Sequence, residues 1–496
     1  DHRDLHSFPT RRSSDLFDPA VWLFLFFGVA AGMVIGAVPG LSATMGVALL
    51  VPFTFGQELM PALGLLLGVY CGAIFGGTIP AILFRTPGTP ASAATLLDGC
   101  PMMQRGEAGR ALALAAGSAM AGGVIGTLLL IFLTPQISRF ALGFGSAEFF
   151  ALAVLGLSLI AALSGDSLLK GAIATVAGLL CATVGLDPVS GYPRFLFGSV
   201  SLMEGLPFIP ALIGLFAIAE VFSGGDQTAG EAGGGRQPFL LLPRLADLGR
   251  CAWTIVKSAL LGTFVGAAPG AGADIAAFLS YSAARQQAGP GDAYGAGEVK
   301  GVAAPEAGKT AATSGAMIPL LSLGIPGDSV TAVLIGAFVL HGVQPGPLLF
   351  RQHAPLAYAI LGLMLCAHLL VFVVALGTSR AVLAALKIDR RFLGAGVLLL
   401  SLMGAYALRA NLADCWVALA FGALGVGMRR TGFPAAPFLL ALILGNMAET
   451  NLRRALVLGD GGLGLFLQRP ASLALLVLAV ALVGVTVWRQ RRRASG

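Results

Sequence analysis

Each half of this 496-residue chain has two Pro-Gly pairs that interrupt apolar stretches, and the pairs lie at matching places in the two halves. The segment GAVPGLSA at 36–43 is echoed by GAAPGAGA at 266–273, which lies 230 residues later. A second echo relates Pro87-Gly88 to Pro326-Gly327, 239 residues later. Because Pro and Gly break helices, each pair leaves backbone N–H and C=O groups without intrahelical partners. Free amides at helix N-termini favour carboxylates and free carbonyls favour cations, so the pattern predicts a site for an anion and accompanying cations.

The breaks and the small hydroxyl side chains beside them are the predicted substrate ligands. Hydroxyl groups can donate hydrogen bonds to an anionic substrate. These residues are Pro39, Gly40, Ser42, Thr44, Thr86, Pro87, Gly88, Thr89, Pro269, Gly270, Gly272, Pro326, Gly327 and Ser329, with Thr331 close by. The alternative is that small residues only let helices approach closely, as they do in membrane proteins. The pairing of the breaks favours binding.

Ionisable residues in apolar surroundings are the second group of candidates. A charge at the bilayer centre costs about 2.5–3.5 kcal/mol on insertion scales, so such residues are retained for a function. Asp274 and Asp328 stand at the third and fourth breaks, and with carbonyls near Gly40 and Gly270 they are the predicted cation-coupling residues. Asp98, Glu306 and Lys309 are expected in polar loops, where solvated charge explains them equally well. His341 and His368 are expected to be packing or interfacial residues rather than proton relays.

The composition shows which elements must position these groups. Apolar residues make up 56% of the chain and charged residues only 11%, and the mean hydropathy is +0.86. A soluble protein carries about 25% charged residues, so a water-soluble globule is excluded. The net charge of +7 lies in short clusters between apolar stretches, which argues against nucleic-acid binding. The lipid bilayer is the solvent for most of the chain.

Apolar stretches long enough to cross or re-enter a bilayer follow one another along the sequence. They lie near 20–38, 59–84, 111–134, 147–163, 171–186, 206–222, 251–268, 311–345, 355–378, 392–408, 412–427, 434–448 and 471–488. The stretch 311–345 is too long for one helix and is predicted to break at Gly324-Ile325-Pro326-Gly327. The predicted fold is an all-α integral membrane protein with about 12 transmembrane segments in two structural repeats with broken or re-entrant helices.

The domain prediction follows from these stretches. Residues 1–16 resemble the translation of a sequencing-library adapter and are expected to be a non-native scar. Residues 17–222 are expected to form membrane repeat 1, 223–250 a polar linker, 251–450 membrane repeat 2, and 451–496 a C-terminal helix and basic tail. The tail carries Arg489 and Arg491 to Arg493 directly after the last apolar stretch. The positive-inside tendency predicts a cytoplasmic C-terminus.

Enzyme motifs were sought. The chain has no HExxH or GxSxG motif, and its six cysteines form no CxxC pair. Gly308-Lys309-Thr310 resembles the end of a P-loop, but Ala304 stands where the first glycine belongs. We therefore expect no enzyme, no metal site and no cofactor.

Several long blocks resemble the large permease subunit of tripartite tricarboxylate transporters, the TctA-like family. The resemblance covers about 20–450 and rests on the blocks 36–55, 68–102, 262–285, 297–337 and 342–350. It implies a bacterial inner-membrane secondary transporter that receives carboxylates from a periplasmic solute-binding protein, works with a small membrane subunit and is driven by a gradient of Na⁺ or H⁺. Citrate-like tricarboxylates are the namesake substrates, and family members carry varied carboxylates.

One departure from the family pattern concerns a lysine. Where the family commonly has PEAANNAA, this chain has PEAGKTAA at 305–312, with Lys309 and Thr310 in place of paired asparagines. The hypothesis that Lys309 contacts a substrate carboxylate adds it to the predicted substrate-binding residues.

Charge arithmetic favours cotransport. Each negative charge enters against an inside-negative potential worth about 2.3 kcal/mol per 100 mV, so cations must accompany a carboxylate. The alternatives are an anion or solute channel, a stand-alone carboxylate permease, and a lipid-modifying membrane enzyme, for which no convergent nucleophile was found.

Overall fold

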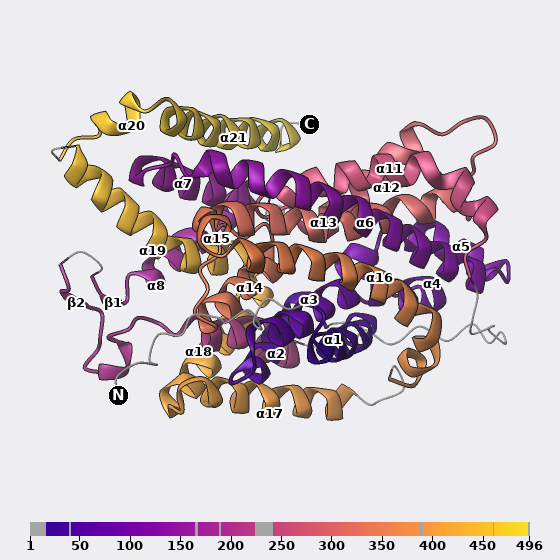
Figure 1. Cartoon of the computed structure of the whole chain (residues 1–496), viewed down its shortest axis with the longest axis horizontal. Coiled ribbons are helices and arrows are strands. Elements are labelled where there is room, and N and C mark those ends of the chain that lie inside the picture. The colour runs from indigo at the N-terminus through magenta and orange to yellow at the C-terminus, as the bar shows by residue number, and fades with distance from the viewer. Residues whose placement is uncertain are drawn as a thin grey trace.

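The computed structural model describes residues 16–38, 41–163, 167–187, 190–223, 242–385, 390–459 and 461–494. These residues are almost entirely helical (Figure 1). The first half contains α1 (Pro19–Ala37), α2 (Ala43–Leu50), η2 (Val51–Thr54), α3 (Leu59–Gly76), α4 (Thr78–Phe84), η3 (Pro90–Ser92), α5 (Leu96–Gln104), α6 (Ala108–Ala141), α7 (Ser146–Leu163), α8 (Leu168–Ala182), β1 (Gly185–Leu186), β2 (Pro193–Arg194), η4 (Val200–Leu202), α9 (Phe208–Leu212), η5 (Ile213–Ile218) and α10 (Ala219–Ser223).

The second half contains α11 (Leu245–Ala267), α12 (Gly272–Gln286), α13 (Val299–Leu323), α14 (Ser329–Leu340), α15 (Pro347–Gln352), α16 (Ala354–Ala385), α17 (Arg390–Arg409), α18 (Leu412–Thr431), α19 (Ala435–Leu458), α20 (Gly464–Gln468) and α21 (Pro470–Ala494). In the described part of the chain, β1 and β2 pair antiparallel, with Gly185 opposite Arg194. Helix α6 packs against both α13 and α16 in the middle of the molecule (Figure 1).

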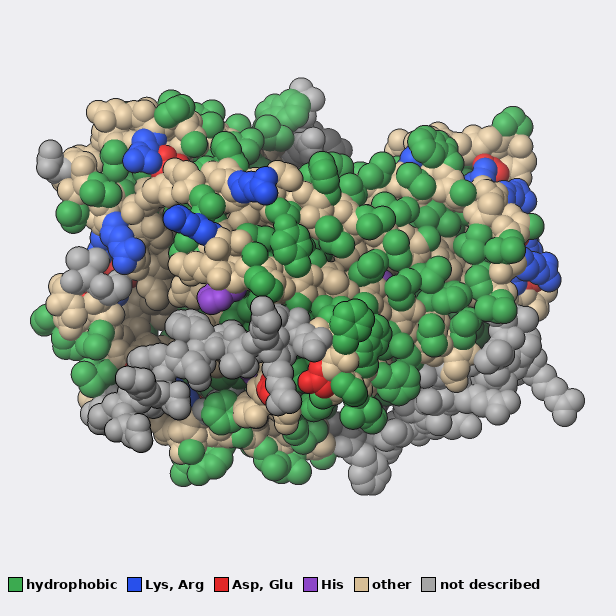
Figure 2. Space-filling model, viewed as in Figure 1, with side chains coloured by type: hydrophobic (Ala, Val, Ile, Leu, Met, Phe, Trp, Pro, Cys, Tyr) green, Lys and Arg blue, Asp and Glu red, His purple; other side chains and the backbone are tan. Residues whose placement is uncertain are grey.

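Seven helical stretches of the described residues are long and apolar enough to cross a membrane. They are Pro19–Ala37, Leu59–Phe84, Ala108–Ala141, Ala354–Gly377, Leu412–Thr431, Ala435–Leu458 and Pro470–Trp488. Exposed aromatic side chains such as Phe27, Phe132 and Phe264 lie on them or on neighbouring helices. Figure 2 shows hydrophobic side chains over much of one face, with Lys and Arg mainly toward the two ends of the long axis. The chain is therefore an all-α, multi-pass membrane protein.

All four predicted helix breaks are present. Helix α1 ends at Ala37 and α2 begins at Ala43, while α11 ends at Ala267 and α12 begins at Gly272. Likewise α4 ends at Phe84 before η3, and α13 ends at Leu323 before α14. The long apolar stretch 311–345 is thus divided into two helices at Gly324–Gly327, as the sequence predicted.

Each helix that ends at a break packs closely against a neighbouring helix: α1 against α3, and α11 against α13. A Cβ added at Gly36 of α1 would lie 2.1 Å from the carbonyl oxygen of Ala73 in α3. A Cβ at Gly266 of α11 would lie 2.2 Å from the carbonyl oxygen of Ala312 in α13. Only glycine permits this backbone-to-backbone approach. The glycines are 230 residues apart and their partners 239, the same offsets that separate the sequence echoes.

The structure corrects one prediction. Asp98, Glu306 and Lys309 were expected in polar loops, but Asp98 lies in α5 and the other two lie in α13, and all three are fully buried. The expectation was wrong because hydroxyl and charged partners from distant segments compensate these charges, which local hydropathy does not show. Helix α11 also begins at Leu245, inside the range expected as linker, where Arg110 pairs with Asp247 at 2.6 Å.

Candidate functional site

The breaks meet in pairs inside the molecule. The backbone N–H of Gly270, whose φ is +86°, donates to the carbonyl oxygen of Gly327 at 2.8 Å. A Cβ at Gly272 would lie 3.6 Å from the Cβ of Asp328. In the first half, a Cβ at Gly88 would lie 2.1 Å from the carbonyl oxygen of Gly36 at the end of α1. Two interrupted segments therefore touch in each half of the chain.

Asp328 joins the breaks of the second half to a helix of the first half. One oxygen, Oδ1, caps α14 by accepting from the Thr331 backbone N–H at 2.8 Å, and the Thr331 hydroxyl accepts from the Asp328 N–H. The other oxygen, Oδ2, accepts from the Tyr70 hydroxyl of α3 at 2.6 Å. Tyr70 is fully buried and Asp328 is 9% exposed. The carboxylate thus combines a helix cap with a contact between halves.

Lys309 makes a second contact between the halves. Its Nζ donates to Thr78 Oγ1 at 2.5 Å and to Ser92 Oγ at 2.9 Å, and it lies 2.8 Å from Glu306 Oε1. The same Glu306 oxygen accepts from Thr78 at 2.9 Å and from Thr95 at 2.6 Å. All five side chains are fully buried. The donors of Lys309 and the Oε1 atom of Glu306 are paired, which offsets part of the cost of burying this ion pair.

The Tyr70–Asp328 and Lys309–Ser92 contacts occupy corresponding places in the two halves, which are related by 239 residues, the same offset that relates Pro87-Gly88 to Pro326-Gly327. Lys309 follows Tyr70 by 239 residues, and Asp328 and Thr331 follow Thr89 and Ser92 by the same distance. Tyr70 reaches the Asp328–Thr331 turn of the other half, and Lys309 reaches the matching turn, where the Thr89 and Ser92 hydroxyls lie 3.2 Å apart. Each half therefore extends a side chain into the break of the other.

The site around Lys309 contains more acidic than basic side chains. Asp274, in the first turn of α12, interacts electrostatically with both Asp328 and Lys309, and its side chain is open to solvent. The carboxylates of Glu306 and Asp274 both interact with the Lys309 ammonium group, and the Asp328 carboxylate interacts with that of Asp274. The second oxygen of Glu306, Oε2, is buried and has no hydrogen-bond partner among the described residues. The surplus of negative charge is suited to binding cations.

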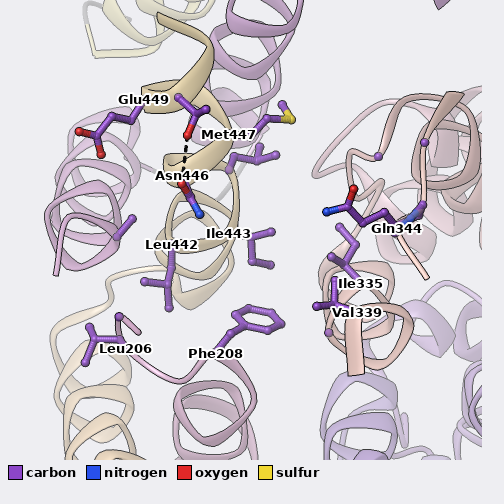
Figure 3. A pocket seen from close by; sticks show the side chains of 18 of the residues that line it. Leu206, Phe208, Ile335, Val339, Gln344, Leu442, Ile443, Asn446, Met447 and Glu449 are labelled. Carbon is purple, nitrogen blue, oxygen red and sulfur yellow. Dashed lines mark hydrogen bonds between the residues drawn. The ribbon is translucent and has the colours of Figure 1, made fainter. Parts of the chain in front are cut away.

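A cavity of about 1230 Å³ reaches the fourth break from one side. Figure 3 shows Leu442, Asn446 and Glu449 of α19 across the cavity from Ile335 and Val339 of α14. Its lining also includes Gly324, the left-handed residue that ends α13 in the break before Asp328. Charged side chains at the wall are partly paired, with Arg194 Nη1 2.6 Å from Glu449 Oε1. The cavity thus combines apolar walls with polar and charged groups.

Comparison with known proteins decides the family. Residues 22–440 match the family described as the tripartite tricarboxylate transporter TctA family. The chain belongs to this TctA family. It is similar to an uncharacterized 52.8 kDa protein in the TAR-I ttuC′ 3′ region of Agrobacterium vitis, with 36% identity over 94% of this chain and 93% of that protein. It is also similar to an uncharacterized protein in the TAR-II ttuC′ 3′ region of Agrobacterium vitis, with 33% identity over 45% of this chain and 92% of that protein.

Membership in the TctA family confirms the resemblance seen in the sequence. It makes the chain a component of a tripartite tricarboxylate transporter. No solved structure matches the chain. Among the described residues, no group of three or more His, Cys, Asp or Glu side chains is placed to hold a metal ion.

In this TctA-family chain, the other predicted ligands are divided between the site and local structure. Thr89 packs against Gly77, and its hydroxyl lies 3.2 Å from that of Ser92, which contacts Lys309. Ser42 caps α2 by accepting from the Met45 N–H at 3.1 Å, and Thr86 donates to the Phe84 carbonyl at 3.2 Å. Thr44 is buried within α2, Ser329 is half-buried at the start of α14, Pro87 and Pro269 are half-buried and Pro326 is buried. Pro39 and Gly40 lie outside the described residues.

Five members of the site were not predicted as ligands. They are Tyr70, Thr78, Ser92, Thr95 and Glu306. The offset of 239 residues would have identified Tyr70 and Ser92, because it relates them to Lys309 and Thr331. No sequence signal distinguishes Thr78 and Thr95 from the other small residues around them. His368, expected as a packing residue, is buried with Nε2 3.1 Å from Ser314 Oγ.

Proposed function

We propose that this TctA-family chain is the large permease subunit of a binding-protein-dependent tripartite transporter and carries out ion-gradient-driven uptake of carboxylates. The observation that carries the proposal is the meeting of helix breaks beside three carboxylates, of which those of Glu306 and Asp328 are buried, and one buried ammonium group. Such an arrangement offers backbone amides to an anion and acidic oxygens to cations within one site. Tricarboxylates of the citrate type or dicarboxylates are the proposed substrates.

The exchange of side chains between halves supports a duplicated unit. Tyr70 contacts the break of the second half, and Lys309, 239 residues later, contacts the break of the first. Reciprocal contacts of this kind are the mark of a two-fold axis. We place the repeats at 17–222 and 251–450. If their axis lies in the membrane plane, the repeats have opposite topology and can rock against each other around the site between them.

In this proposal, hydrogen-bond donors bind the substrate, and acidic side chains and carbonyl oxygens bind the cations. The substrate carboxylates bind the amides and hydroxyls at the breaks, including Gly270, Thr89 and Ser329. Asp274 and Asp328 bind the coupling Na⁺ or H⁺, together with carbonyls near Gly40 and Gly270. A dianion or trianion would be repelled by the surplus negative charge unless cations bound with it, and this requirement couples the two. The cavity beside Gly324 supplies access from one side of the membrane.

The proposed partners are a periplasmic solute-binding protein and a small membrane subunit. The proposed location is the bacterial inner membrane, and Lys and Arg side chains lie mainly toward the two ends of the long axis in Figure 2. The Arg489–Arg493 segment favours a cytoplasmic C-terminus.

Uptake into proteoliposomes tests the proposal. The purified chain is reconstituted with its small subunit and binding protein, and uptake of labelled citrate, succinate and malate is measured with the membrane potential clamped. We expect accumulation above the external concentration only when an inward Na⁺ or H⁺ gradient is imposed. Downhill flux that ignores both gradients would instead indicate a channel. Full accumulation without the binding protein would indicate a stand-alone permease.

A further inference from the structure

We propose that the Lys309 ammonium group is a built-in cation that fills a monovalent-cation position and thereby replaces one coupling ion. The inference deepens the proposed function, on which it rests for the idea of cation coupling. It concerns the half of the site that contains Glu306, where the structure shows how the negative charge is compensated.

The surroundings of Lys309 are those of a small cation. Three oxygens from three separate segments surround Nζ at 2.5, 2.9 and 2.8 Å: Thr78 Oγ1 in α4, Ser92 Oγ in η3 and Glu306 Oε1 in α13. An ammonium group has three N–H donors, and each has an acceptor here. Because Lys309 is fully buried and fully paired, it has no donor left for a substrate carboxylate. This argues against the hypothesis that Lys309 binds substrate directly.

The corresponding position in the first half lacks this charge. Tyr70 stands 239 residues before Lys309 and offers a neutral hydroxyl to Asp328. No lysine or arginine is recorded in an ion pair with Asp328 or Asp274 among the described residues, although Lys309 acts on Asp274 from a distance. At these two positions, therefore, the Glu306 carboxylate pairs with the ammonium group of the chain's own Lys309, whereas the Asp328 carboxylate pairs with a neutral hydroxyl and takes a mobile cation.

Shortening Lys309 should open a cation site. In Lys309→Ala, the oxygens of Thr78, Ser92 and Thr95 and both oxygens of Glu306 would remain around the vacated space. One of these, Glu306 Oε2, is already buried without a described partner. A buried, unpaired carboxylate is costly, so Na⁺ binding at this place is strongly favoured in the variant.

The stoichiometry of coupling tests the inference. Wild type and Lys309→Ala are compared in proteoliposomes under a tenfold inward Na⁺ gradient, with equal pH and zero potential, using the carboxylate that wild type accumulates. One additional coupled Na⁺ adds about 1.4 kcal/mol, which raises the accumulation ratio about tenfold above that of wild type. Equal accumulation by the two proteins would overturn the inference. Lys257→Ala, at a surface lysine that donates to Gln287, is the control and should match wild type.

Direct binding of radioactive Na⁺ to the purified protein separates this inference from the proposed function. Lys309→Ala should bind one more Na⁺ per chain than wild type, whether or not either protein transports a carboxylate, and Glu306→Gln/Lys309→Ala should lose that additional ion. No additional Na⁺ in the single variant refutes the inference. If the single variant aggregates in choline chloride, Na⁺ should restore a monodisperse protein. Aggregation in both salts counts against the built-in cation.

Discussion

At the residue scale, Asp328 has two functions that its two oxygens keep apart. Oδ1 accepts from the Thr331 N–H and caps α14, whereas Oδ2 accepts from the Tyr70 hydroxyl and lies at the contact between halves. A cap needs only an oxygen acceptor, and asparagine provides one as well as aspartate does. Binding of a coupling cation needs the negative charge. A substitution that removes the charge and keeps the oxygen therefore separates the two functions.

Asp328→Asn is expected to reduce gradient-driven uptake about tenfold or more, because a loss of 1.4 kcal/mol in cation binding suffices for that change. Its Tm should stay close to that of wild type, since the cap on α14 is retained. Tyr70→Phe is the matched comparison: it keeps the charge, loses one hydrogen bond and should retain more uptake. Wild-type uptake by Asp328→Asn would show that Asp328 has only a structural role.

Asp98 illustrates a buried charge with a structural role. Its Oδ1 accepts from the backbone N–H groups of Gly295, Gly297 and Glu298, each at 2.8 Å, and its Oδ2 accepts from the Tyr281 hydroxyl at 2.9 Å. The side chain is fully buried. It therefore fastens the loop between α12 and α13, in the second half, to α5 in the first.

Removing this acceptor should destabilise the protein. Asp98→Ala is expected to lower the free energy of unfolding by about 3 kcal/mol, because several buried donors lose their acceptor and each costs about 1–3 kcal/mol. Asp98→Asn should cost less, since its amide oxygen can still accept. Thermal unfolding in detergent measures both. Equal stability of Asp98→Ala and wild type would contradict the role assigned to this carboxylate.

At the element scale, glycine contacts set the distances between the helices that present the breaks. A Cβ at Gly262 of α11 would lie 2.1 Å from the carbonyl oxygen of Gly308 in α13, next to Lys309. The atom it would meet belongs to the backbone, so no side-chain rotation can relieve the contact. Helices α11 and α13 would have to separate, which would move Glu306 and Lys309 away from α4 and η3.

Gly262→Ala is expected to cost about 1–3 kcal/mol of stability by overpacking and to reduce uptake. The control is Gly249→Ala in the same helix, where an added Cβ has no neighbour within 4 Å. Alanine there should be neutral or stabilise by about 0.5–1 kcal/mol. Similar Tm values for the two variants would show that α11 and α13 tolerate a wider spacing.

The sequence predicts the breaks well and the buried charges poorly, for a physical reason. Pro and Gly act on the backbone of their own segment, so the ends of α1, α4, α11 and α13 follow from local chemistry. The burial of Glu306 and Lys309 depends on partners in α4, η3 and Thr95, more than 200 residues away. The segment 299–310 is rich in Gly and Ala and lacks the apolar periodicity that marks a buried helix. Contacts between residues more than 200 positions apart can be inferred from the sequence only through the offset of 239 residues between the two halves.

At the scale of the whole molecule, the account requires the two halves to enclose a substrate between their breaks. Ser329 is half-buried at the start of α14, next to the Asp328 cap, and so lies where a bound carboxylate would shield it. Ser190, exposed in the β1–β2 connection, supplies a control position. Cysteine at either position can be modified by a water-soluble thiol reagent, provided that the native cysteines are first replaced.

The most direct measurement is the rate at which that reagent modifies Ser329→Cys in a preparation that transports. The account predicts that a transported carboxylate and the coupling cation, added together, slow this modification several-fold, that either one alone slows it less, and that Ser190→Cys reacts at an unchanged rate. An unchanged rate at Ser329→Cys with saturating substrate and cation would contradict the claim that the carboxylate binds between the paired breaks.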